Sequence, residues 1–342
     1  MAELNSIHVG HQVDKLITMD LPFRGVIDIL YPAAREKAGA PLTMLAAQRL
    51  LGAVKAHDII LIATGWPDRP HISPEVAETD GPPGAALLGR ALHRGLKALP
   101  FFLVETRLIH AMKSVTQSAG FRVLSPEEAI AASQSSSPLH GAAVLGFPTD
   151  PEEARQESTT LLNRYKPQAV ITIEKGGMNE KGIVHTSRGH DTTEQMAKVD
   201  FLVAEARSRN ILTIGIGDGG NEVGMGNIRD VIRQRLPFGA QCRCPCGQGI
   251  APVTEVDVLV TGTVSNWAAY GISACLAWLL RDAAVMHEED LEKWFLYHAS
   301  DAGLIDGISG FVEPGADGLR APMHGHLVEL LKGLVEQGIH RA

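Results

Sequence analysis

The chain alternates between short apolar runs and longer segments in which apolar positions recur every three or four residues. The short runs are almost continuously apolar and rich in β-branched residues, which is typical of strands covered on both faces. The predicted strands are 58–64, 101–105, 142–147, 169–174, 211–217 and 256–262. Helical periodicity lies between them, for example at 82–99, 150–165 and 192–209.

This alternation predicts an α/β fold with a mostly parallel sheet flanked by helices, because right-handed βαβ units leave helices on both faces. The two ends of the chain have helical patterns, so we expect helical N- and C-terminal extensions. We predict one domain over 1–342, with a helical segment at 1–57, an α/β core at 58–310 and a C-terminal helix at 311–342. The serine-rich stretch at 131–140 is expected to be a surface loop.

Composition narrows the class of protein. Of the 342 residues, 45% are apolar and 20% are charged, as in ordinary globular proteins. The net charge of -8 argues against a nucleic-acid partner. No segment is apolar for the roughly 18 residues that a membrane span needs, and the N-terminus lacks signal or transit features. We therefore expect a cytoplasmic location with no membrane or nucleic-acid partner, and the sequence leaves a homo-oligomer open.

Three of the four cysteines, Cys242, Cys244 and Cys246, fall in one short segment. A C-x-C-x-C cluster could bind zinc, but the usual spacing is C-x2-C and no fourth ligand is obvious nearby. We favour reduced thiols in a loop rich in glycine and proline, as expected in the cytosol.

Acidic residues follow two neighbouring predicted strands. Glu174 ends the strand 169–174, and Asp218 follows the strand 211–217 with Glu222 four residues further on. Ligands of such sheets bind beyond the carboxyl ends of the strands, and carboxylates that converge there repel one another unless a cation offsets their charge. We expect these three residues to bind a hard divalent cation. The alternative is that Asp218 and Glu222 only cap a helix N-terminus.

The glycine-rich segment after the strand 211–217 satisfies the dinucleotide fingerprint G-x-G-x-x-G at 215–220. Its context argues against a nucleotide, because Asp218 would lie beside the phosphates and no acidic residue follows about twenty positions later. The glycines instead let the backbone approach a ligand closely. Gly219, Gly220 and Asn221 are therefore expected substrate contacts.

Further polar residues lie near the predicted strand ends, in the segment 172–195. Lys175 and His190 are candidates for proton transfer, and Asp191 could serve a metal or a proton transfer. Arg188 could hold a substrate carboxylate bidentately. The alternative is that Asp191 begins a helix and that His190 is structural.

Two more groups of residues are expected at the same edge of the sheet. Thr64 and Gly65 follow the first predicted strand and could form the opposite wall together with residues 78–81. Ser265 and Asn266 begin an apolar helix. They could simply cap it, or its free N–H groups could bind a substrate carboxylate.

Several of these segments together resemble the family of D-glutamate cyclase C-terminal-like proteins. The matching segments are ATGW, ETDGPPGAA, IEKGGMNEKGIVHTSRG, IGIGDGGNEVGMG and VSNWAAYG. The resemblance implies a hydro-lyase activity, the reversible dehydration of D-glutamate to 5-oxo-D-proline, and hence a small amino acid as substrate. It also implies a manganese or magnesium ion at the acidic cleft.

In the reaction that the resemblance implies, the cation would be held by Glu174, Asp218 and either Glu222 or Asp191. Lys175 or His190 would transfer protons. Arg188 and the helix start at 265–266 would anchor the α-carboxylate of the substrate. The alternatives are a metal-dependent hydrolase or phosphatase that acts on another small acid, and a protein that binds a metal or nucleotide without turnover.

Overall fold

The computed structural model describes residues 2–137 and 139–341 and is built around a parallel sheet of seven strands. The strand order is β3-β4-β2-β1-β5-β6-β7, and all neighbouring strands are parallel. The strands are β1 (Ile59–Thr64), β2 (Leu99–Glu105), β3 (Arg122–Val123), β4 (Gly141–Phe147), β5 (Ala169–Ile173), β6 (Leu212–Gly217) and β7 (Val258–Thr261). The expected parallel sheet is confirmed. β3 was not predicted, because two residues carry no periodicity.

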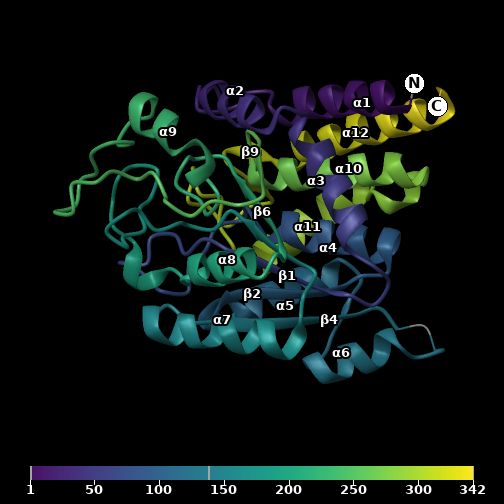
Figure 1. The fold of residues 1–342 in the computed structure, drawn as a ribbon, viewed down its shortest axis with the longest axis horizontal. Coiled ribbons are helices and arrows are strands. Elements are labelled where there is room, and N and C mark those ends of the chain that lie inside the picture. Colours follow the sequence, from purple (N-terminus) through teal and green to yellow (C-terminus); the bar gives the residue numbers. More distant parts are fainter. Residues whose placement is uncertain (1, 138, 342) are drawn as a thin grey trace.

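Helices cover both faces of the sheet. They are α1 (Ala2–Ile17), α2 (Ile27–Ala38), α3 (Leu42–Ala53), α4 (Pro82–Leu96), α5 (Ile109–Ser118), α6 (Pro126–Ser133), α7 (Pro151–Tyr165), α8 (Val199–Ser208), α9 (Arg229–Arg235), α10 (Ser265–Leu280), α11 (Glu289–Asp301) and α12 (Ala321–Arg341). In Figure 1, α1, α3, α10 and α12 gather on one side of the sheet and α6 and α7 lie on the other. A short hairpin of β8 (Gly315–Ala316) and β9 (Leu319–Arg320) precedes α12. The helical extensions at both ends are confirmed, but the C-terminal helix expected at 311–342 begins at Ala321, because this hairpin precedes it. No helix in the described ranges could cross a membrane.

Two predicted helices and the serine-rich loop have different boundaries in the structure. The helix expected at 192–209 begins at Val199, because a 3₁₀ turn precedes it and the Lys198 ammonium donates a hydrogen bond to the Met196 carbonyl at 2.6 Å. The helix expected at 82–99 ends at Leu96, where Lys97 takes a left-handed conformation with φ 58°. Residues 131–133 of the expected loop belong to α6, and residue 138 lies outside the described residues.

Helix α10 is central to the core. Every residue from Ser265 to Trp278 is buried, and the helix packs against α1, α3, α4 and α12. A helix that is apolar on all sides is stable only when neighbours surround it. Its packing fixes the N-terminal residues of α10 at the edge of the sheet where β7 ends.

The strand order reverses between β1 and β5. From β1, strands are added through β2 towards β3 on one side, and β5, β6 and β7 follow on the other. In open α/β sheets, ligands bind at the carboxyl ends of the strands on either side of such a switch point. In this chain those ends are followed by Gly65, Glu174 and Asp218.

Candidate functional site

A cavity of about 1100 Å³ opens at this switch point. Glu174 and Asp218 line it from the ends of β5 and β6, and Trp66 lines it beyond β1. The sequence-predicted site residues that line it are Glu174, Arg188, His190, Asp191, Asp218, Gly219 and Asn221. The other predicted site residues do not line the cavity; they are Thr64, Gly65, Lys175, Gly220, Glu222, Ser265 and Asn266.

Buried carboxylates converge around Asp218. Oxygens of Glu174, Asp218 and Glu222 lie within 4.8 Å of one another, as do oxygens of Asp80, Asp218 and Asp317. Asp218 belongs to both groups, and all five residues are buried. The sequence indicated the first group. It gave no sign that Asp317 would join, because that residue lies beyond the predicted core.

Four of these five carboxyl groups hold protons more tightly than usual. Burial raises the pKa of Asp80 and of Glu222 to about 7, and the negative charge of Asp218 adds to both shifts. The pKa values of Glu174 and Asp317 are also raised well above their ordinary range, first by burial and then by Asp218. A bound cation would offset this repulsion and displace the protons. The oxygen-only donor set suits a hard divalent cation.

Arg24 partly balances the cluster, and the sequence pattern did not indicate it. Its guanidinium donates to Asp218 Oδ2 at 2.7 Å and lies 3.1 Å from Asp317 Oδ2. Burial alone would lower the pKa of Arg24, but these two carboxylates raise it. Among the described residues, Asp317 Oδ2 is buried without a hydrogen bond. A carboxylate oxygen of this kind is suited to a cation.

Glu222 shapes the glycine-rich loop. Its Oε1 accepts hydrogen bonds from the N–H groups of Asp218 and Gly219 at 3.0 and 2.5 Å, and its Oε2 accepts from Gly220 and Asn221, each at 2.9 Å. A Cβ at residue 217 would lie 2.7 Å from the Glu222 carboxyl carbon, so this close approach requires glycine. No helix begins here, since the loop leads into a 3₁₀ turn at Gly226–Ile228, and the capping alternative therefore does not apply.

The four hydrogen bonds occupy the acceptor sites of the Glu222 carboxylate. Glu222 is therefore better suited to holding the loop, and with it Asp218, than to binding a metal.

Glu174 and the start of α10 are joined. Glu174 has a left-handed backbone with φ 46°, and its Oε2 accepts a hydrogen bond from the Ser265 hydroxyl at 2.6 Å. The backbone N–H groups of Ser265 and Asn266 both donate to Asp80 at 2.9 Å. The Asn266 side chain accepts from the N–H groups of Gly81 and Gly84. Asp80 thus occupies these two N–H groups of α10, so the alternative in which they are free to bind a substrate carboxylate does not apply to them.

Lys175 lies in a buried ion pair. Its ammonium donates to both carboxylate oxygens of Glu105, at 2.6 and 2.7 Å, and to the carbonyls of Gly65 and Thr64 at 2.7 and 3.3 Å. Burial lowers the pKa of Lys175, and Glu105 acts in the opposite direction. The ammonium is surrounded by acceptors, which suits a role in positioning the backbone at the end of β1.

The remaining candidates lie on the outer wall of the cavity. Arg188, His190 and Asp191 are exposed on the loop before α8. Asp191 Oδ1 accepts a hydrogen bond from the Thr193 N–H at 2.9 Å, and Asp191 belongs to neither of the carboxylate groups. Arg188 and His190 are accessible to a bound molecule.

Comparison with known proteins identifies the family of this chain. The sequence model of the family described as "D-glutamate cyclase-like, C-terminal" matches residues 13–332. The chain belongs to this family. It is also similar to the human protein named "D-glutamate cyclase, mitochondrial", with 28% identity over 304 residues. The alignment covers 81% of this chain and 45% of the human protein, so this family member corresponds to less than half of that relative.

Proposed function

We propose that this chain is a metal-assisted D-glutamate cyclase that interconverts D-glutamate and 5-oxo-D-proline with loss or gain of water. The observation that carries the proposal is the buried carboxylate cluster around Asp218 at the switch point of the sheet. Membership of the D-glutamate cyclase-like family supports the choice of substrate and its handedness. The cytoplasmic location is also a proposal, because the similar human protein is named mitochondrial.

In the forward direction, the α-amine nitrogen forms a bond to the γ-carboxyl carbon, and the bond from that carbon to one of its oxygens breaks. The ammonium gives up two protons, which leave with that oxygen as water. The γ-carboxylate is a poor electrophile because it carries a negative charge. Mn²⁺ or Mg²⁺, held by Asp218 together with Glu174 or with Asp80 and Asp317, would neutralise that charge and polarise the carbonyl.

The residues of the chain have separate tasks in this proposal. His190, which is exposed on the cavity wall, removes a proton from the substrate ammonium. Arg188 binds the α-carboxylate bidentately. Asn221 and the backbone of Gly219 border the cavity and limit the orientations of the substrate. Holding the amine close to the carboxyl carbon supplies a large part of the rate enhancement.

A substrate panel tests the proposal. The purified chain is incubated with Mn²⁺ or Mg²⁺ and with D-glutamate, L-glutamate, D-aspartate or an aryl phosphate, and products are separated by chromatography. Lactam formation from D-glutamate alone supports the cyclase. Release of phosphate would favour a metal-dependent phosphatase. Thermal stabilisation by ATP or NAD without turnover would favour a nucleotide-binding protein.

A further inference from the structure

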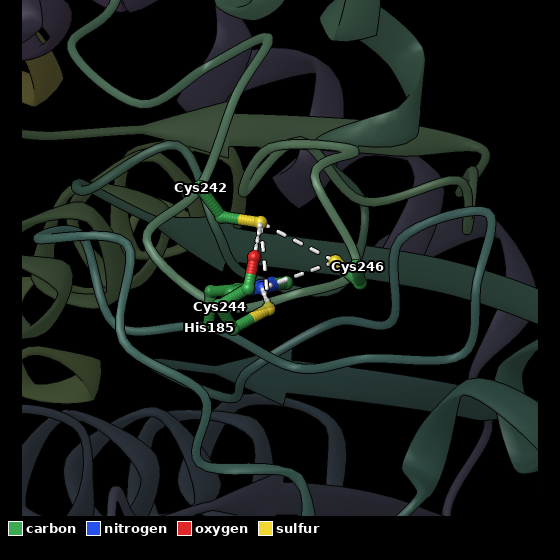
Figure 2. A group of neighbouring side chains, drawn as sticks. All are labelled: His185, Cys242, Cys244 and Cys246. Carbon is green, nitrogen blue, oxygen red and sulfur yellow. Dashed lines mark hydrogen bonds between the residues drawn. The ribbon is translucent and has the colours of Figure 1, made fainter.

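A second cluster of candidate metal ligands lies outside the acidic cavity. It consists of His185, Cys242, Cys244 and Cys246, which come from two segments almost sixty residues apart. Figure 2 shows the three sulfur atoms and the ring nitrogen pointing toward a common centre. The sequence offered no fourth ligand near the cysteines, because the chain brings in the histidine only when it folds.

The distances within the cluster are those of ligands around one small ion. Cys242 Sγ lies 3.5 Å from Cys244 Sγ and 3.3 Å from Cys246 Sγ. His185 Nε2 lies 3.2 Å from Cys244 Sγ and 3.7 Å from Cys246 Sγ. In a tetrahedral zinc site, bond lengths of about 2.3 Å to sulfur and about 2.0 Å to nitrogen place neighbouring ligands about 3.5–3.8 Å apart.

The chemistry of the four groups selects the metal. Thiolate and imidazole ligands in a tetrahedral arrangement favour Zn²⁺ over the hard cations suited to the acidic cavity. His185 is fully buried and Cys242 is nearly so, while Cys244 and Cys246 are half-buried, so an ion can reach the cluster. A disulfide would use two of the three thiols and leave the third cysteine and the histidine without a role.

We propose that His185, Cys242, Cys244 and Cys246 bind one Zn²⁺ ion in a closed, structural site. Four protein ligands leave no open position for a substrate. The ion ties the loop that begins near Asn179 to the irregular segment 239–252. Both segments have little regular secondary structure, so a metal contributes a large share of their order.

The zinc site also supports the acidic cavity. The carbonyl of His185 accepts a hydrogen bond from the Asn221 side chain at 2.8 Å, and Asn221 lines that cavity. The Arg243 N–H donates to the Gly189 carbonyl at 2.9 Å, next to His190. The ion therefore stabilises the outer wall of the cavity through these two hydrogen bonds, without contact with the substrate.

Metal analysis and cobalt spectroscopy test the site. We expect the full chain, purified under reducing conditions with zinc in the medium, to contain one zinc per molecule. Replacing the zinc with Co²⁺ should produce thiolate-to-cobalt charge-transfer absorption and tetrahedral ligand-field bands. Absence of zinc together with absence of these bands in folded, reduced protein would overturn the proposal. A cross-link between two of the three thiols in freshly purified protein, detected by thiol counting, would overturn it as well.

Variants separate this site from the acidic cavity. Cys244→Ser should lose zinc and show a lower Tm, while Cys275→Ser, a buried cysteine in α10 outside the cluster, should keep its zinc. Asp218→Asn should also keep zinc. Loss of zinc in Asp218→Asn but not in Cys244→Ser would contradict the assignment. If Cys244→Ser does not fold, the cobalt spectrum of the unmodified chain still decides, and neither result depends on cyclase activity.

Discussion

The Arg24 guanidinium donates a hydrogen bond to Asp218 Oδ2 at 2.7 Å, across 194 positions of sequence. Arg24 lies between α1 and α2, so the helical N-terminal segment contributes directly to the cavity. Among the described cationic residues on the cavity wall, ion pairs with Asp218 and Asp317 are formed by Arg24. It offsets part of their repulsion when no metal is bound.

Arg24→Gln is expected to destabilise the metal-free protein by about 1–3 kcal/mol, because it leaves Asp218 and Asp317 without their cation. Mn²⁺ should recover most of this loss by supplying the missing charge. Denaturant unfolding with chelator and with Mn²⁺ measures both effects. Arg207→Gln, which breaks an exposed pair with Glu255, serves as the control and should change stability by less than about 1 kcal/mol. An equal loss with and without Mn²⁺ would contradict this role of Arg24.

Glu222→Gln is expected to destabilise the fold by about 2–4 kcal/mol even without metal, because an amide nitrogen would replace one of the two acceptor oxygens that face backbone N–H groups. The exposed Glu255→Gln is the matched control. Unfolding measured in chelator distinguishes the roles. If Glu222→Gln lost only metal affinity and kept its metal-free stability, Glu222 would be a ligand and not the residue that shapes the loop.

Lys175→Met is expected to cost about 3–5 kcal/mol of stability, because it leaves the Glu105 carboxylate buried and unpaired. The double variant Lys175→Met/Glu105→Leu should recover part of that loss. A double-mutant cycle from denaturant unfolding measures the coupling. A Lys175→Met variant with unchanged stability and no activity would instead show that Lys175 transfers protons.

The acidic cluster predicts how stability depends on pH. The pKa of Asp80 is about 7 in the folded protein against an ordinary value of 3.8. Between these two values the folded state binds more protons than the unfolded state, so stability falls as pH rises from about 4 to about 7. The stability that protonated Asp80 contributes is fully present below about pH 4 and is lost above about pH 7.

Thermal unfolding in chelator across this range measures the effect, and Asp80→Asn, which cannot ionise there, should show a weaker decrease. The increase in Tm on adding Mn²⁺ should grow with pH, because binding displaces the protons. A metal effect that does not change between pH 5 and pH 8 would contradict this interpretation.

The sequence predicted the site residues that directly follow buried strands. Glu174 and Asp218 follow apolar strands, and the ends of parallel strands meet at one edge of the sheet, so their convergence needed no knowledge of packing. Arg24 and Asp317 could not be predicted in this way. They reach the cavity because the terminal segments pack around the buried helix α10.

The role of each individual side chain depends on hydrogen bonds that the pattern of residue types along the chain does not reveal. Lys175 and Glu222 have residue types suited to catalysis and metal binding. In the structure, however, the Lys175 ammonium is paired with Glu105, and the Glu222 carboxylate accepts hydrogen bonds from four backbone N–H groups. His185 lies far in sequence from the cysteines that it meets. The fold class was easier to predict, since continuous apolar runs determine where buried strands lie.

The most direct measurement of the proposed activity is Mn²⁺-dependent interconversion of D-glutamate and 5-oxo-D-proline by the purified chain, followed by chromatography in both directions. We predict turnover that chelator removes and Mn²⁺ restores, and that Asp218→Asn lowers by about a hundredfold or more while staying folded. No turnover in either direction by folded, metal-loaded protein would contradict the proposed function.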